Sequence, residues 1–215
     1  MTTSIEDYIE SHISPEPELL AETERQSNLK FINGRMCSGH IQGRLLRMLV
    51  AMAAPRRVLE IGTFTGYSAL CIAEGLPEDA TLDTIEIDDE LEDFLRRNFS
   101  RSPYGNKIRL HIGDALQILK NFNKEEFDLA FIDGDKRKYV EFFDMVFPLV
   151  REGGFIIADN TLWDNHVIES GKHSSQTRGI MDFNDYIASR TDLFIAILPV
   201  RDGLSIIQKL DAAKR

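Results

Sequence analysis

Val58-Leu59-Glu60-Ile61-Gly62-Thr63-Phe64-Thr65-Gly66 is a short apolar run that ends in two closely spaced glycines. It predicts a strand followed by a tight turn, with a helix starting at about Tyr67. Glycines let the backbone approach a ligand closely, and a helix N-terminus directs its N–H groups and positive dipole end at that ligand. The stretch therefore predicts a nucleotide-like cofactor site. The alternative is that Gly62 and Gly66 only pack the helix against the strand.

After this segment, short β-like runs alternate with amphipathic segments. The predicted strands cover residues 58–61, 81–87, 107–112, 127–132 and 154–158. Such alternation favours βαβ units with right-handed crossovers and a parallel sheet covered on both faces. Two further runs, 193–200 and 204–210, flank the tight-turn signal Asp202-Gly203 and predict a C-terminal hairpin. We expect a Rossmann-like α/β fold with a seven-stranded, mostly parallel sheet and an antiparallel C-terminal strand.

The segment before the first strand is predicted to form an N-terminal helical cap. Ser14-Pro15 followed by Glu18 resembles a helix start, and apolar residues recur at helical spacing from Ile41 until Pro55 stops the run. At 215 residues the chain fits one domain, and no metal or disulfide is needed merely to fold it. We expect a single domain over 1–215, with a cap at 1–54 and an α/β core at 55–215.

Composition narrows the range of partners. The net charge of −10 opposes binding to nucleic acid, so a small molecule is the expected partner. The two cysteines, Cys37 and Cys71, have neither disulfide-framework nor metal-ligand spacing and fit a reducing compartment. The N-terminus lacks the features of a signal peptide, and no apolar run is long enough to cross a membrane. We therefore predict a soluble, cytoplasmic protein without a membrane partner.

Acidic residues end the second and third predicted strands. Glu86 follows Gly66 by 20 residues, the distance at which such folds present a carboxylate to ribose hydroxyls. Asp114, beside Ala115, could accept the exocyclic amine of an adenine, and it could also cap the following helix; both roles can be true. Glu86 could equally be a solvated acid at a strand end.

Glu60 distinguishes between cofactors. A dinucleotide would bring its pyrophosphate near the end of the first strand, where a carboxylate repels it. The same carboxylate suits an ammonium or a sulfonium. Glu60 therefore favours S-adenosylmethionine over NAD.

Oxygen-bearing side chains end the fourth and fifth predicted strands. Asp133 ends the fourth, and Asp159-Asn160 end the fifth. If these strands are neighbours, the three side chains reach the same crevice at the carboxyl edge of the sheet. Two carboxylates and an amide oxygen suit Mg²⁺, with Mn²⁺ and Ca²⁺ as alternatives, better than Zn²⁺. Taken singly, such residues more often cap helices or form turns.

Lys136, three residues after Asp133, is the candidate general base. Three protein ligands would leave open positions on the ion, and a vicinal diol on an aromatic ring could take two of them. Lys136 could then accept the remaining hydroxyl proton, provided that the ion lowers its pKa. A lone lysine is more often a solvated surface charge than a base.

From about Arg35 to Leu210 the chain resembles the cation-dependent O-methyltransferases, which include catechol and caffeoyl-CoA O-methyltransferases. Four stretches carry the resemblance: 60–68 (EIGTFTGYS), 133–136 (DGDK), 159–163 (DNTLW) and 198–203 (LPVRDG). The resemblance implies a class I methyltransferase fold, an S-adenosylmethionine cofactor, a divalent cation and a small aromatic acceptor. It also implies a homodimer.

The resemblance also assigns roles to individual residues. By it, the cofactor contacts are Met36, Glu60, Gly62, Ser68, Glu86, Asp114, Ala115 and Asp133. The metal ligands are Asp133, Asp159 and Asn160, and the catalytic base is Lys136. Trp163 and Asp202 lie where the family contacts its substrate.

Two departures from the family pattern bear on the site. Gly134 stands where the family commonly has alanine, and we expect no effect on ligation because glycine adds no side chain. His40 in the cap is unusual, and we weigh a substrate-contacting acid–base group against a plain helix-start residue. No basic cluster for a CoA phosphate is evident, which favours a free catechol-type phenol. A nicotinamide-dependent oxidoreductase and a non-catalytic cofactor-binding protein remain the alternatives.

Overall fold

A computed structural model describes residues 4–31 and 34–211. Residues 1–3, 32–33 and 212–215 of the predicted domain lie outside these ranges. Seven strands form one sheet in the order β3-β2-β1-β4-β5-β7-β6. The strands are β1 (Arg57–Ile61), β2 (Thr81–Glu86), β3 (Ile108–Ile112), β4 (Phe127–Ile132), β5 (Val150–Asp159), β6 (Leu193–Leu198) and β7 (Leu204–Lys209).

The pairing of the strands confirms the predicted mixed sheet. Strands β1 to β5 are mutually parallel, whereas β7 is antiparallel to both β5 and β6. The strand β5 begins at Val150, four residues before its predicted start at Gly154. Gly153, with φ of 73°, and a register shift between Phe127 and Leu129 interrupt the regular pattern there. Gly153 and Gly154 interrupt the apolar pattern, so the sequence did not predict the first four residues of this strand.

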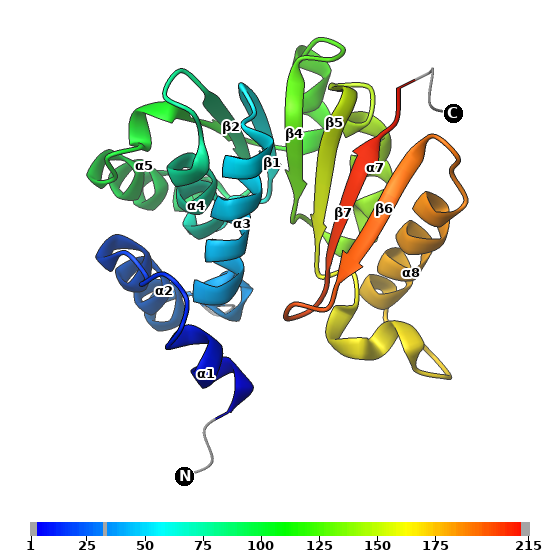
Figure 1. Ribbon diagram of the computed structural model, residues 1–215, viewed down its shortest axis with the longest axis horizontal. Helices are drawn as coiled ribbons and strands as arrows, with labels where there is room; N and C mark the ends of the chain where they lie inside the picture. Colours follow the sequence, from blue (N-terminus) through cyan, green and yellow to red (C-terminus); the bar gives the residue numbers. More distant parts are fainter. Residues whose placement is uncertain (1–3, 32–33, 212–215) are drawn as a thin grey trace.

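Helices cover both faces of the sheet. They are α1 (Ile5–Glu10), α2 (Glu18–Lys30), α3 (Gly39–Ala53), α4 (Tyr67–Gly75), α5 (Glu92–Arg101), α6 (Ala115–Ile118), α7 (Tyr139–Val146) and α8 (Ser175–Ala188). In Figure 1, α3 and α4 lie on one face and α7 lies on the other. Among the described residues, no helix has the length and apolar character needed to cross a bilayer.

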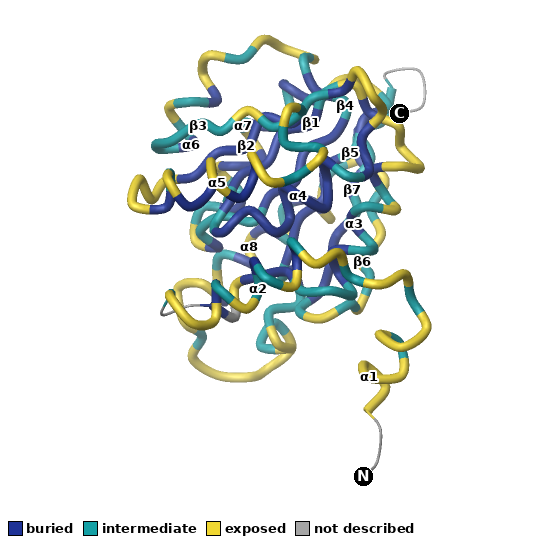
Figure 2. Tube along the Cα trace, turned by 90° about the vertical axis from the view of Figure 1, so that its left-hand side faces the viewer, coloured by how far each residue is buried: buried dark blue, intermediate teal, exposed yellow. Residues whose placement is uncertain are grey.

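Strand alternation divides the apolar residues into two cores. Leu59 and Ile61 pack with α7 and α8, whereas Val58 packs with α3, α4 and α5. Glu60 is two residues from Val58, so it points to the α3 and α4 face. Figure 2 shows that burial is concentrated in α4 and the central strands, while α1 has no buried residue.

The predicted cap is helical and lies beside the carboxyl edge of the sheet. The helix α2 begins at Glu18 after Pro17 and packs on the core through Ser27, whose hydroxyl donates to Thr65 Oγ1 at 2.8 Å. In α3, Gln42, Leu46 and Val50 recur every four residues and form its buried face. Within the cap, α2 therefore contacts the turn after β1, while α3 packs with α4 on one face of the sheet.

Candidate active site

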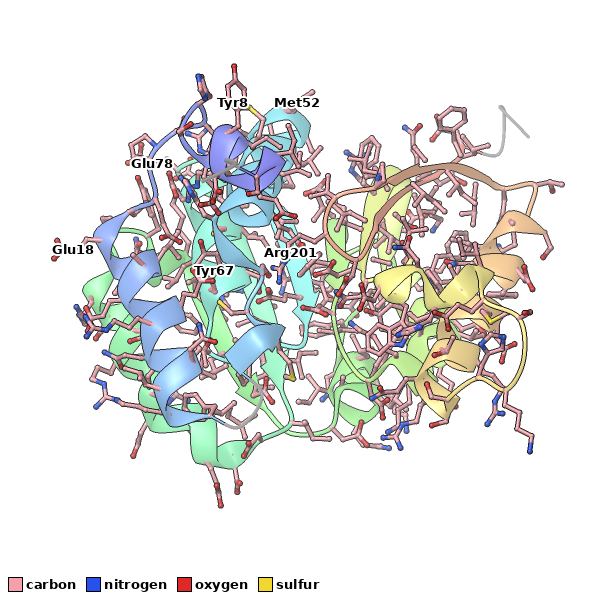
Figure 3. The ribbon with its side chains drawn as sticks, turned by 90° about the horizontal axis from the view of Figure 1, so that it is seen from below. Tyr8, Glu18, Met52, Tyr67, Glu78 and Arg201 are labelled. Carbon is pink, nitrogen blue, oxygen red and sulfur yellow. The ribbon has the colours of Figure 1, made fainter. Side chains whose placement is uncertain are left out.

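A cavity of about 880 Å³ opens at the carboxyl edge of the sheet. This volume is in the range of small-molecule sites. Its walls come from the end of α2, the short helix Gly34–Met36, the turns after β1, β2, β4 and β5, and the β6–β7 turn. Figure 3 looks onto this edge from below. The position is the one expected for a ligand site in an open α/β sheet.

The glycine turn after β1 brings two strand ends together. Gly62 has φ of 94°, and a Cβ built there would lie 2.2 Å from the Asp133 carbonyl oxygen. Gly66 has φ of 85°, and its Cβ would lie 2.7 Å from the Phe99 ring. Both glycines therefore permit a close approach, of the β1 turn to the end of β4 at Gly62 and of α5 to the start of α4 at Gly66. Gly62 also lines the cavity.

Glu60 is fully buried beside this turn. Thr84 Oγ1 donates to Glu60 Oε2 at 2.5 Å, whereas Oε1 has no hydrogen-bond partner among the described residues. Burial raises the pKa of Glu60 to about 7, and the hydroxyls of Ser68 and Thr84 only partly offset it. An unpartnered buried carboxylate oxygen is costly unless a ligand supplies a donor.

Glu86 ends β2 and lines the cavity. Its Oε2 accepts from the Phe64 N–H at 2.6 Å and its Oε1 from the Asp88 N–H at 2.9 Å. Burial raises the pKa of Glu86, and these backbone donors partly oppose that shift. The two hydrogen bonds fix the carboxylate, and each oxygen keeps acceptor capacity for a hydroxyl group.

Asp133, Asp159 and Asn160 line the same cavity, from the ends of the neighbouring strands β4 and β5. Asp159 is almost fully buried, and burial raises its pKa, with the Asp133 carboxylate raising it further. Asn160 has φ of 55°, and its Nδ2 lies 3.5 Å from Asp202 Oδ2. Two acidic groups that repel each other favour a bound cation.

Lys136 is buried between acidic and aromatic partners. Its Nζ donates to Asp133 Oδ1 at 2.7 Å and to the Tyr139 hydroxyl at 2.6 Å. Burial opposes its charge, but Asp133, Tyr139 and Asp159 outweigh burial and raise the pKa of Lys136. In this arrangement Lys136 is a protonated ammonium, so proton acceptance requires a further positive charge nearby.

Two residues that the sequence did not single out complete this corner. Gln42 Nε2 donates to Asp159 Oδ2 at 2.5 Å, and the Tyr139 hydroxyl donates to the Asp159 carbonyl at 2.9 Å. The signal for Gln42 was a polar residue on the otherwise apolar, buried face of α3. The signal for Tyr139 was its position three residues after Lys136.

The other candidate residues divide into two groups. Met36, Trp163 and Asp202 line the large cavity, and Ser68 borders a smaller one next to Gly62. Three lie elsewhere: Asp114, Ala115 and His40 are not among the residues lining either cavity. Asp114 Oδ1 accepts from the Leu116 N–H at 2.8 Å, so Asp114 caps α6, which is one of its two compatible predicted roles. A ring nitrogen of His40 lies 2.8 Å from the Ser14 carbonyl oxygen.

The chain resembles proteins of known activity over most of its length. A model of the family described as O-methyltransferase matches residues 10–210. Caffeoyl-CoA O-methyltransferase 2 of Zea mays is 32% identical over 206 residues, which cover 91% of this chain and 78% of that relative. Catechol O-methyltransferase of Niastella koreensis is 31% identical over 160 residues, covering 73% and 72% of the two chains.

Solved structures agree with these sequence relatives. The O-methyltransferase TomG of Streptomyces achromogenes, in complex with S-adenosylmethionine, has a TM-score of 0.88, 27% identity and 95% coverage of both chains. The O-methyltransferase of Bacillus cereus, in complex with S-adenosylhomocysteine, has a TM-score of 0.85 and 27% identity, and covers 96% of this chain and 97% of its own. The chain therefore belongs to the O-methyltransferase family and is an S-adenosylmethionine-dependent O-methyltransferase.

Proposed function

We propose that this O-methyltransferase requires a divalent cation and methylates one hydroxyl of a vicinal diol on a small aromatic ring. The observation that carries the proposal is that Asp133, Asp159 and Asn160 line the same cavity as Lys136 and the Gly62 turn. A cation-binding corner thus adjoins the cofactor turn. A diol bound at that corner would lie beside both a proton acceptor and a methyl donor.

Glu60 supports the assignment of the cofactor-binding residues. Its buried, unpartnered Oε1 suits the ammonium of the methionine part of S-adenosylmethionine, with Ser68 beside it. Glu86 would bind the ribose hydroxyls through its two fixed oxygens. Met36, Gly62, Asp114, Ala115 and Asp133 are the remaining proposed cofactor contacts. Asp114 keeps Oδ2 as an acceptor for a ligand donor, because its hydrogen bond to the Leu116 N–H uses Oδ1.

The donor set at the end of β4 and β5 fits a hard cation. Asp133 and Asp159 supply carboxylate oxygens and Asn160 an amide oxygen, which favours Mg²⁺, Mn²⁺ or Ca²⁺ over softer metals. Within 4–31 and 34–211, no group of three His, Cys, Asp or Glu side chains could hold a metal ion. The proposed site therefore depends on Asn160 for its third protein ligand.

The proposed mechanism assigns proton transfer to Lys136. A divalent ion held by Asp133, Asp159 and Asn160 would supply positive charge that lowers the pKa of a nearby hydroxyl and of the Lys136 ammonium. Lys136 Nζ then accepts the proton of the acceptor hydroxyl, and Tyr139 holds Nζ in place by its hydrogen bond. Glu60 and Glu86 would hold the methyl donor. The deprotonated hydroxyl oxygen would bond to its methyl carbon as the sulfur–methyl bond breaks, and S-adenosylhomocysteine would be the leaving group.

Aromatic and apolar side chains support a small aromatic acceptor. Trp163 and Met36 line the cavity, and Asp202 lies beside Asn160. Relatives named for caffeoyl-CoA and for catechol both match this chain, so both acceptor types are candidates. We favour the free catechol-type phenol. His40, held against Ser14, remains a weaker proposed acceptor contact.

We further propose that 1–215 form one domain, that the protein is cytoplasmic and that it binds no nucleic acid.

We also propose that the protein is a homodimer. The edge strand β6 exposes Phe194 at 67% and Ile197 at 43%, and an apolar edge can be covered by the same edge of a second copy. Light scattering after size exclusion would test the dimer.

A methylation assay tests the proposed activity. The metal-stripped protein is incubated with S-adenosylmethionine and catechol, or with the CoA thioester of a dihydroxycinnamic acid, and then given Mg²⁺, Mn²⁺ or Ca²⁺. We expect methylated product only when a cation is present, whereas calorimetry should detect S-adenosylmethionine binding with or without it. Asp159→Ala should behave like the stripped protein at every cation concentration. Full turnover without metal would contradict the proposal.

A further inference from the structure

The turn between β6 and β7 places an arginine where a glycine would be less strained. Arg201 has φ of 50°, in the left-handed region that non-glycine residues avoid. Gly203, two residues later in the same turn, has φ of 88° without that penalty. The side chain at position 201 therefore sits on a backbone conformation that disfavours it.

The guanidinium of Arg201 is oriented but not neutralised. Its Nη1 donates to the Cys37 carbonyl at 2.9 Å and also to the Ser38 carbonyl. Its Nε and Nη2 have no hydrogen-bond partner among the described residues. No carboxylate oxygen of those residues lies within 4.0 Å of the guanidinium nitrogens. Arg201 lowers the pKa of Glu24, which burial raises, so that acid is near without forming an ion pair.

The other cations that line the cavity are already paired. Lys136 Nζ lies 2.7 Å from Asp133 Oδ1, and Arg137 Nη2 lies 2.6 Å from Asp135 Oδ2. Among the described side chains of the cavity wall, Arg201 is thus the cation whose partners are neutral carbonyl groups. A net charge of −10 repels anions at long range, so binding of an anion in this cavity needs a local cation that has no acidic partner.

Arg201 is also placed near the proposed diol site. The next residue, Asp202, lies 3.5 Å from Asn160 through its side chain and accepts the Leu162 N–H at 2.7 Å through its carbonyl oxygen. Figure 3 shows Arg201 near the middle of the carboxyl edge. An aromatic ring whose hydroxyls lie at Asn160 could therefore direct a substituent toward Arg201.

We propose that Arg201 is a specificity-determining residue that binds the carboxylate of an acidic aromatic diol. The two unused donors of its planar guanidinium suit the two oxygens of a carboxylate. The phosphates of a CoA thioester offer similar anionic oxygens, and the test separates them from a free carboxylate. This inference rests on the proposed function, because it concerns the acceptor of the same reaction.

The test compares 3-(3,4-dihydroxyphenyl)propenoic acid with its neutral methyl ester and its CoA thioester. For each acceptor, kcat and KM are measured, and Kd is measured by calorimetry in the presence of S-adenosylhomocysteine and cation. The wild type should prefer the acid over the ester. Arg201→Gln should reduce this preference about 10–100-fold, which is the effect of losing one charge-assisted interaction, mainly through KM.

Three further variants give the test its controls. Arg137→Gln removes a cavity arginine that is already paired and should leave the acid-to-ester ratio unchanged. Arg201→Gly relieves the turn and reports whether folding survives without the side chain. Arg201→Lys keeps the charge but not the planar donor pair and should recover only part of the preference.

Several outcomes would overturn the inference. An equal loss for acid and ester would make Arg201 a structural clamp on the residues that precede α3. If Arg201→Gln weakened activity only toward the CoA thioester, the ligand of Arg201 would be a CoA phosphate and not a free carboxylate. If Arg137→Gln reduced the acid-to-ester preference equally, the preference would come from the overall positive charge of the cavity and not from Arg201. If the wild type methylates none of the acceptors, the proposed function fails, while the Kd ratio of acid to ester still decides the role of Arg201.

Discussion

Gln42 donates a hydrogen bond from Nε2 to Asp159 Oδ2 at 2.5 Å and so joins the cap to the proposed cation site. Asp159 Oδ1 accepts from the Asn160 N–H at 2.7 Å. Both oxygens of this carboxylate are therefore oriented by donors from the protein. Because Gln42 is 1% exposed, its hydrogen bond is sheltered from competing water.

Replacing Gln42 by leucine should weaken cation binding. Residues that orient a ligating carboxylate typically change metal affinity or activity by about 10–100-fold when removed. We expect a loss in that range for Mg²⁺, measured by calorimetry, with S-adenosylmethionine affinity nearly unchanged. Ser205→Ala is the matched control, because it removes another buried hydrogen bond, to Thr161 Oγ1 at 2.8 Å. Equal cation affinity in the leucine variant and the wild type would refute the positioning role.

The Gln42 contact also shows where the sequence stopped being informative. The turn after β1 and the acids that end β4 and β5 could be predicted because strand, turn and ligand type are encoded within a few neighbouring residues. The contact from Gln42 joins residues 117 positions apart, and no local pattern specifies which strand end a helix will meet.

Electrostatic state was equally hard to predict. The position of Lys136 was predicted from its spacing to Asp133, but its charge depends on how deeply it is buried and on Tyr139 and Asp159 around it. The role of Asp114 also depended on the fold. Its spacing allowed both a ligand contact and a helix cap, and of these the fold shows the cap, a hydrogen bond from the Leu116 N–H to Oδ1.

Lys136→Ala should lower kcat with little change in cofactor affinity. Removing a general base typically costs about 100-fold to 10,000-fold in rate. We expect a fall of this size in single-turnover rates at saturating cation, with the Kd for S-adenosylmethionine preserved. Lys138→Ala, in the same turn of the chain, controls for the loss of a nearby charge. If kcat stays at the wild-type level, Lys136 has no role in proton transfer.

Glu60 should make the protein less stable as pH rises through the neutral range. Its pKa is about 7 in the folded protein against 4.5 for an ordinary glutamate, so the folded state holds a proton that the unfolded state releases. Because the pKa of Glu60 is raised in the folded state, its contribution to the free energy of unfolding is fully present below pH 4.5. This contribution is lost as the pH rises from 4.5 to about 7. The loss between pH 5 and pH 8 should be about 2–3 kcal/mol.

Urea unfolding of the wild type and of Glu60→Gln at pH 5 and pH 8 measures this contribution. The glutamine cannot ionise, so the free energy of unfolding of the variant should fall less between the two pH values than that of the wild type. The same variant should bind S-adenosylmethionine more weakly at pH 8, where the wild-type carboxylate is charged. Parallel pH dependences in the two proteins would show that Glu60 is not buried with a raised pKa.

Gly134→Ala should destabilise the protein even though the backbone at this position is not strained. A Cβ at residue 134 would lie 2.8 Å from the Phe142 ring and 3.3 Å from Ile61 Cγ2, so α7 or its ring must move. Overpacking of this kind typically costs about 1–3 kcal/mol. Phe142→Leu in the same background should recover part of the loss by making room, and urea unfolding measures both. A free energy of unfolding equal to that of the wild type would mean that the Phe142 ring moves aside without a measurable loss of stability.

The Mg²⁺ affinity of Gly134→Ala separately tests the expectation that residue 134 has no effect on cation ligation. We expect the affinity of the wild type.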